Sequence, residues 1–183
     1  MWDDKKAREI TIDFQASPEI IEHVEMVRSA SIDLIGKLRK KNPAIKINKN
    51  LVSVGALLHD IGRTKTQGID HAVVGAQMIR ELNKDSDPDI ERVALICERH
   101  IGGGITKSEA AKIGLPEKDY IPKAIEEKIV SYCDNLVDEE NGVSVIRDPS
   151  WVAVKYEKKH GKNSEPARMV RELNKFFENM LSA

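Results

Sequence analysis

The sequence predicts an all-α protein that folds as one helical bundle, and three observations support this prediction. Apolar residues recur every three or four positions along most of the chain, which is the spacing of one face of an amphipathic helix. Ser17-Pro18, Asp87-Pro88 and Asp148-Pro149 each place a capping side chain before a proline that suits the first helical turn. The alternation of apolar and polar residues that marks a half-buried strand is almost absent.

Length and composition limit the classes of protein to consider. The 183 residues suit one domain, and 29 Lys and Arg against 30 Asp and Glu give a formal net charge of −1. This balance does not suggest avid binding to duplex DNA or RNA. Cys97 and Cys133 lie at apolar helix positions and make no disulfide framework. We therefore interpret them as small buried side chains of a protein in a reducing compartment of the cell. We find no signal-peptide pattern and no apolar run of membrane-spanning length, which predicts a soluble cytoplasmic protein.

The first long helix is expected to begin at Ser17-Pro18 and to end at Asn42-Pro43, where the proline disfavours further helix. Residues 1–16 are of mixed character and are expected to form a loosely packed arm or a short element. His23 lies on the apolar face of the long helix. Taken alone, a histidine in such a position is more often a satisfied core residue than a ligand.

The second helix is expected over residues 48–60 and is apolar nearly all round, which places it at the centre of the bundle. It ends in the pair His59-Asp60. A polar loop over residues 64–69 leads to a third helix, for which Asp70 is the expected cap and His71 the first residue. Taken alone, His71 would be interpreted as a solvated histidine at a helix start.

The fourth helix begins at Asp87-Pro88 and directs His100 inward at its C-terminal end. Three consecutive glycines, residues 102–104, follow it. They give a flexible backbone that can approach a ligand closely, although a plain turn between helices is the alternative. Thr106, with a glutamate three residues later, then predicts a capping box for a short helix.

The remaining helices complete the bundle. The next one covers residues 122–138, and its Asp134 flanks an apolar stripe where an unpaired carboxylate would be poorly tolerated. Another helix begins at Asp148-Pro149 and ends at His160, which lies among lysines and is interpreted as a surface residue. An amphipathic helix opened by Ser164 ends the chain.

Side chains that suit metal binding gather on the inward faces and at the ends of these helices. Burying a pair such as His59-Asp60 beside so much hydrocarbon is costly unless a partner satisfies it. A metal ion does so, because imidazole nitrogen and carboxylate oxygen suit Zn, Fe, Mn and related cations; for this pair alone, a buried hydrogen bond explains the pattern equally well. One core that holds four imidazoles and two carboxylates is improbable without metal. The candidate ligands are His23, His59, Asp60, His71, His100 and Asp134.

The order of these residues resembles the HD-domain metal-dependent phosphohydrolase superfamily over roughly residues 18–140. His59-Asp60, within Leu-Leu-His-Asp-Ile-Gly-Arg, matches the family's signature dipeptide and its HDIG variant. His23 matches the first histidine of the family and Asp134 its final aspartate. His71 and His100 match the two extra histidines of binuclear members, as in the branches that hydrolyse diadenosine tetraphosphate and cyclic dinucleotides. The resemblance implies an HD-type bundle, with the helices of residues 148–182 packed on the metal-binding core.

The resemblance also implies a mechanism. Two divalent cations, drawn from Fe, Mn, Ni, Zn or Mg, would lie about 3.5–4 Å apart and share Asp60. His23, His59 and Asp134 would hold one cation, and His71 with His100 the other. A metal-bound hydroxide would attack phosphorus, and Arg63 would neutralise charge on the phosphoryl oxygens. Weaker candidates for substrate contacts are Lys65, Lys128 and the backbone N–H groups of Gly102, Gly103 and Gly104.

We therefore expect a phosphohydrolase that acts on a nucleotide or another phosphoester: a phosphomonoesterase, a phosphodiesterase or a dinucleoside-polyphosphate hydrolase. The alternative is a non-catalytic module that senses a nucleotide or binds a partner on an HD scaffold. The complete set of ligands favours the enzyme, because a binding module does not need all of them. The expected partner is a small phosphorylated molecule, without membrane association or strong nucleic-acid binding; a homodimer is left open.

Overall fold

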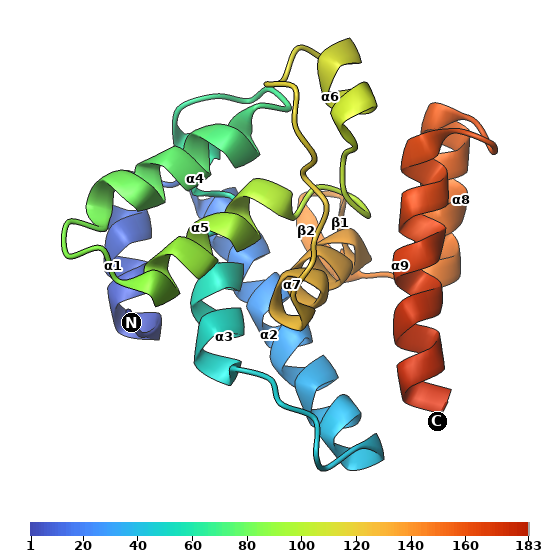
Figure 1. Ribbon diagram of the computed structural model, residues 1–183, viewed down its shortest axis with the longest axis horizontal. Coiled ribbons are helices and arrows are strands. Elements are labelled where there is room, and N and C mark those ends of the chain that lie inside the picture. The colour runs from blue at the N-terminus through green and yellow to red at the C-terminus, as the bar shows by residue number, and fades with distance from the viewer. Residues whose placement is uncertain (183) are drawn as a thin grey trace.

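Nine α-helices, one 3-10 helix and one β-hairpin make up residues 1–182, which are the residues that the computed structural model describes (Figure 1). The helices are α1 (Asp4–Asp13), α2 (Pro18–Lys41), α3 (Lys49–Leu58), the 3-10 helix η1 (Ile61–Thr64), α4 (His71–Leu82), α5 (Pro88–Arg99), α6 (Lys107–Lys112), α7 (Ile125–Leu136), α8 (Pro149–His160) and α9 (Glu165–Ser182). The hairpin consists of β1 (Val137–Glu140) and β2 (Val143–Ile146). The predicted all-α class is confirmed.

The three predicted starts before proline are confirmed by capping hydrogen bonds. The side chain of Ser17 accepts a hydrogen bond from a backbone N–H of α2, and Asp87 and Asp148 do the same for α5 and α8. Asp70 is the N-cap residue of α4, as expected, but its side chain makes no capping hydrogen bond to the helix. Its carboxylate instead accepts a hydrogen bond from Thr66 Oγ1 at 3.0 Å, which closes the loop before the helix.

Helix α3 lies at the centre of the bundle, as its apolar sequence predicts. Every residue from Leu51 to Leu58 is buried, and α1, α2, α5 and α7 all pack against this helix. The first residues form the helix α1 rather than a loose arm, because Ala7 and Ile10 are buried and Arg28 of α2 pairs with Asp4. Among the described residues, no helix combines the length and apolar character needed to cross a bilayer.

The β-hairpin differs from the prediction, because the sequence patterns indicate helix up to residue 138 and no strand. The helix stops at Leu136, and the antiparallel strands pair Val137 with Ile146. Asn141 and Gly142 form the turn with φ of 55° and 77°. Asparagine and glycine adopt such positive angles readily, and an Asn-Gly dipeptide is a strong hairpin signal.

Helices α8 and α9 lie side by side along one flank of the molecule (Figure 1). Phe177 of α9 is buried, and the centroid of its ring lies 4.6 Å from that of Tyr132 in α7. A Cβ on Gly103 would lie 2.2 Å from the backbone carbonyl of Met169, so only glycine allows this approach to α9. The glycines before α6 are thus explained in part by packing.

Candidate metal centre

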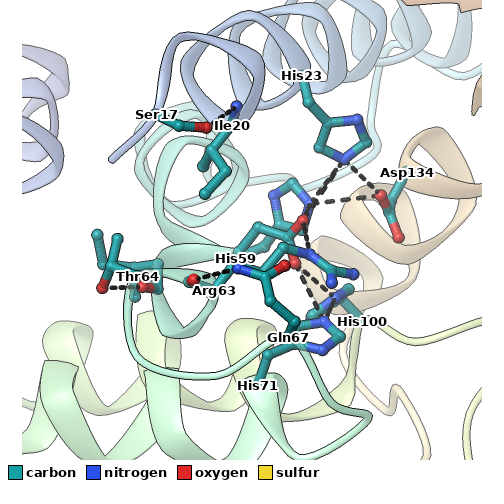
Figure 2. Close-up of polar contacts among 12 residues, drawn as sticks. Ser17, Ile20, His23, His59, Arg63, Thr64, Gln67, His71, His100 and Asp134 are labelled. Atoms are coloured by element: carbon teal, nitrogen blue, oxygen red, sulfur yellow. Dashed lines mark hydrogen bonds and ion pairs between the residues drawn. The ribbon is translucent and has the colours of Figure 1, made fainter. Parts of the chain in front are cut away.

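The six candidate ligands meet in one cluster, although they come from five separate helices and their ends (Figure 2). His23 lies in the second turn of α2 and Asp134 in the last turn of α7. His71 is the first residue of α4. His59 and His100 are the residues that follow the last turns of α3 and α5, and Asp60 comes directly after His59. Helices that cross near their ends therefore bring together residues that lie far apart in the sequence.

Two groups of side chains share the Asp60 carboxylate. In the first group, Nε2 of His23 and of His59 lie 3.0 and 3.3 Å from Asp134 Oδ1, and 3.9 and 4.0 Å from Asp60 Oδ2. In the second group, Nε2 of His71 and of His100 lie 3.1 and 3.5 Å from Asp60 Oδ1. Asp60 thus stands between two pairs of imidazoles and presents one oxygen to each.

Backbone carbonyls determine which ring nitrogens carry hydrogen in three of the histidines. Nδ1 of His59, His71 and His100 lies 2.7, 2.8 and 2.7 Å from the carbonyl oxygen of Ala56, Gly68 and Cys97, in each case three residues earlier. Because a carbonyl only accepts, Nδ1 must donate, and Nε2 of the neutral ring is left with a lone pair. Metal-binding histidines typically use this arrangement to fix the ring and its tautomer.

Two of these lone pairs face each other at a distance that only a cation or a proton can satisfy, because Nε2 of His71 and of His100 are 3.2 Å apart. Nε2 of His59 lies 3.3 Å from Nε2 of His23, which is also 3.0 Å from Asp134 Oδ1. Asp60 Oδ1 is buried and has no hydrogen-bond partner among the described residues. Buried polar atoms left in this state are unfavourable. The cluster therefore fits divalent cations in its chemistry as well as in its residue types.

The charges of the cluster shift the pKa values of its members. Burial disfavours the ionised form of Asp134, but the neighbouring imidazoles outweigh it and hold the pKa well below the usual range. The same balance lowers the pKa of Asp60. Burial also opposes the charged form of His59, yet Asp60 and Asp134 raise its pKa to about 9. The pKa of His100 is lowered, by burial and by its neighbour His59. The cluster thus attracts one positive charge, for which a metal ion would compete with a proton.

A cavity of about 550 Å³ opens onto this cluster beside His23, Asp60 and Asp134. Arg63 lines it and donates from Nε to Asp60 Oδ2 at 2.7 Å, so the guanidinium is fixed at the mouth of the site. It is the one lysine or arginine among the described residues that line this cavity. The hairpin and the start of α2 supply an acidic rim that consists of Glu19, Glu22, Asp138 and Glu139.

The structure places the weaker substrate candidates outside this cavity. Nζ of Lys65 lies 5.8 Å from the ring of Phe14, and Nζ of Lys128 lies 4.5 Å from the ring of Phe176. The three glycines line a different cavity, and the carbonyl of Gly102 accepts hydrogen bonds from side chains of α7. Sequence reasoning missed the hairpin side of the site, for which the Asn-Gly turn was the available signal.

The chain belongs to the HD domain family, because the family model described as HD domain matches residues 20–137. Among related proteins, the uncharacterized protein MJ0778 of Methanocaldococcus jannaschii is 44% identical over 165 residues, which cover 90% of this chain and 91% of that protein. The tRNA (cytidine(56)-2'-O)-methyltransferase of Picrophilus torridus is 49% identical over 118 residues, which cover 64% of this chain and 31% of the methyltransferase. The same methyltransferase of Thermoplasma volcanium is 44% identical over 134 residues, which cover 73% of this chain and 36% of that protein.

The chain therefore matches only about a third of the length of either methyltransferase. Among solved structures, the HD domain of the Listeria monocytogenes phosphodiesterase PgpH in complex with cyclic-di-AMP is similar, with a TM-score of 0.49, 18% identity and 94% coverage of each chain. The family inferred from the order of the histidines and aspartates is confirmed.

Proposed function

We propose that this protein is a metal-dependent phosphohydrolase that acts on a small phosphorylated molecule. One observation carries the proposal: imidazole lone pairs, fixed by backbone carbonyls, converge from two sides on the shared Asp60 carboxylate. Membership of the HD domain family supports it independently.

The residues divide between two metal positions. His23, His59 and Asp134 would hold one cation, His71 and His100 the other, and Asp60 would be common to both. Divalent cations in such a pair supply activated water and stabilise charge on phosphoryl oxygens. Ligand sets of histidine and aspartate accept Fe, Mn, Ni, Zn or Mg, so the identity of the metal has to be measured.

Arg63 would position the phosphoryl group. Its Nε is engaged by Asp60, which leaves the terminal nitrogen atoms of the guanidinium for oxygen atoms of the substrate. Fixed, charge-assisted donors of this kind stabilise charge that develops during the reaction. The acidic rim acts in the opposite sense, because the carboxylates of Glu19, Glu22 and Glu139 repel strongly anionic molecules, whereas that of Asp138 is paired with Lys155. The rim favours phosphomonoesters and phosphodiesters over substrates with long polyphosphate chains.

The test is a screen of metal-analysed protein against mono-, di- and cyclic nucleotides and dinucleoside polyphosphates with each divalent metal. Asp60→Asn should abolish hydrolysis and leave the helical circular dichroism unchanged, because the amide keeps the shape but supplies one neutral acceptor. Arg63→Ala should keep the metal and lose roughly 10- to 1000-fold in turnover. Arg168→Ala, on an exposed face of α9, is the matched control and should behave as the parent. Wild-type turnover by Asp60→Asn would refute the proposal.

A second candidate is a partner-binding module without catalysis, and the two methyltransferases favour it. In each of them the matching region is about a third of a longer protein that acts on tRNA. If no phosphoester is cleaved with any metal, this candidate takes over. It predicts saturable binding of the metal-loaded chain to a tRNA transcript or to a tRNA methyltransferase, measured by fluorescence anisotropy.

A further inference from the structure

A second cavity, of about 320 Å³, lies behind the three-glycine loop and takes no part in the centre described above. Helix α6, helix α8 and the start of α9 enclose it. Most of its lining is apolar, with Ile69, Ile101, Ile105 and Ile113 on one side. Its volume lies at the lower end of the range of small-molecule sites.

Shared wall residues place this cavity next to a third one, which in turn adjoins the metal centre. A third cavity of about 200 Å³ lies between α7 and α8 and is lined by Asp134 and by Lys155. Tyr156 and Lys159 line both this third cavity and the apolar one, whereas Asp134 lines both it and the cavity over the metal centre. The third cavity thus lies between the other two, because it shares the candidate ligand Asp134 with one of them and two residues of α8 with the other.

The walls of the apolar cavity are held in place before any ligand arrives. Tyr156 donates from its hydroxyl to Asn135 Oδ1 at 3.0 Å, and Asn135 donates to the carbonyl of Gly102 at 2.8 Å. Ser131 donates to the same carbonyl at 2.6 Å. This chain of hydrogen bonds fixes α8 and the glycine loop to α7, the helix that carries Asp134. A site that is pre-formed in this way loses little freedom when it binds.

The chemistry of the lining suits a flat, uncharged ring with N–H groups on its edge. The rings of Tyr156 and His160 are stacked with centroids 5.7 Å apart and an interplanar angle of 27°. Burial and the neighbouring Lys159 lower the pKa of His160, so its ring is neutral near pH 7. The carboxylates of Glu109 and Glu165 line the same space and can accept hydrogen bonds from a base edge.

We propose that the apolar cavity binds the nucleobase of the substrate, and that Lys159, where two cavities meet, binds its phosphate. This inference rests on the proposed function and makes the substrate a nucleotide. Tyr156 and His160 provide the stacking surface, which suits any base because every base has a π-face. Lys159 would direct the phosphate towards Asp134 and the metal centre.

The inference is tested by nucleotide binding to the full chain in the presence of a metal chelator, which prevents hydrolysis. The probes are adenosine, guanosine and their 5'-monophosphates, measured by calorimetry. At least one nucleoside should bind together with its monophosphate. His160→Ala should weaken both by about tenfold, the loss expected for one stacked base. Lys159→Ala should weaken binding of the monophosphate and leave binding of the nucleoside unchanged. Lys158→Ala removes the same charge from an exposed neighbouring position and should change neither.

The result separates this inference from the proposed function. If phosphoesters are hydrolysed but neither nucleoside binds, or if His160→Ala binds as the parent does, the nucleobase site is wrong and the phosphohydrolase stands. If nucleosides bind with the expected losses in the variants and nothing is hydrolysed, the site stands and the catalytic proposal is wrong.

Discussion

Substitution of Gly62 tests whether close packing of backbone holds the two halves of the candidate centre together. A Cβ at this position of η1 would lie 2.0 Å from the carbonyl oxygen of His71 and 2.7 Å from the amide nitrogen of Gly75. Ordinary contact begins at 3.4 Å, so the first of these distances must grow by 3.4 − 2.0 = 1.4 Å. Both obstructing atoms belong to the backbone of α4, and no side chain can rotate away. The whole start of α4, with His71, must therefore move from Asp60.

Overpacking of this kind costs typically 1–3 kcal/mol, and a backbone clash puts Gly62→Ala at about 3 kcal/mol. For a chain of this length that corresponds to a fall in Tm of roughly 6–12 °C. The assay is thermal and urea unfolding in chelator, followed by metal content after reloading. Gly36→Ala is the control, because nothing lies within 4 Å of its added Cβ and it should stabilise α2 by about 0.5–1 kcal/mol. If Gly62→Ala unfolds at the parent's temperature, the packing argument is refuted.

Three further predictions concern charge and metal. Burial opposes the ionised form of Glu98, yet Lys118 and Arg80 outweigh it and lower its pKa, so its stabilisation is present above pH 4.5 and lost as pH falls through the lowered pKa. Glu98→Gln should therefore cost about 1–2 kcal/mol at neutral pH, since both partners stay partly solvated, and its urea midpoint should approach the parent's below pH 4.5; a constant difference would contradict this. Removal of metal by chelation should lower Tm by roughly 5–10 °C, because a metal ion at a hundred times its Kd stabilises the folded state by about 2.7 kcal/mol. An unchanged melting curve would count against a centre that joins the helices. His71→Ala should reduce the metal content measured by mass spectrometry towards one ion per chain, and two tightly held ions would exclude the division into two positions.

The candidate centre was accessible from the sequence because its information lies in residue type and local position. Each of the histidines sits on an apolar helix face or at a helix end, where burial follows from the pattern of the helix itself. Start signals such as Asp87-Pro88 fixed the helices that carry them. The six ligands could then be inferred from their order along the chain, without knowledge of the angles at which the helices pack.

The remainder depends on contacts between distant segments, which local patterns do not contain. The requirement for glycine at Gly103 comes from Met169, which lies 66 positions later in the chain. Asp70 has the sequence of a helix cap, but its partner is decided by the loop that reaches Thr66. The role inferred for His160 depends on a cavity formed by α6, α8 and α9, so sequence reasoning gave only a surface histidine among lysines.

The ends of α3 and α5 show how a helical bundle can build such a centre from few residues. The last carbonyls of a helix have no partner within it, and His59 and His100 use those of Ala56 and Cys97 for their Nδ1 groups. One histidine thus completes the helix end and aims its Nε2 lone pair inward. The direction of the ring follows from the local backbone and stays the same when the ion is removed. Without an ion, only a proton can compensate lone pairs that face one another in this way, so the same geometry would favour the metal-bound state over the metal-free one.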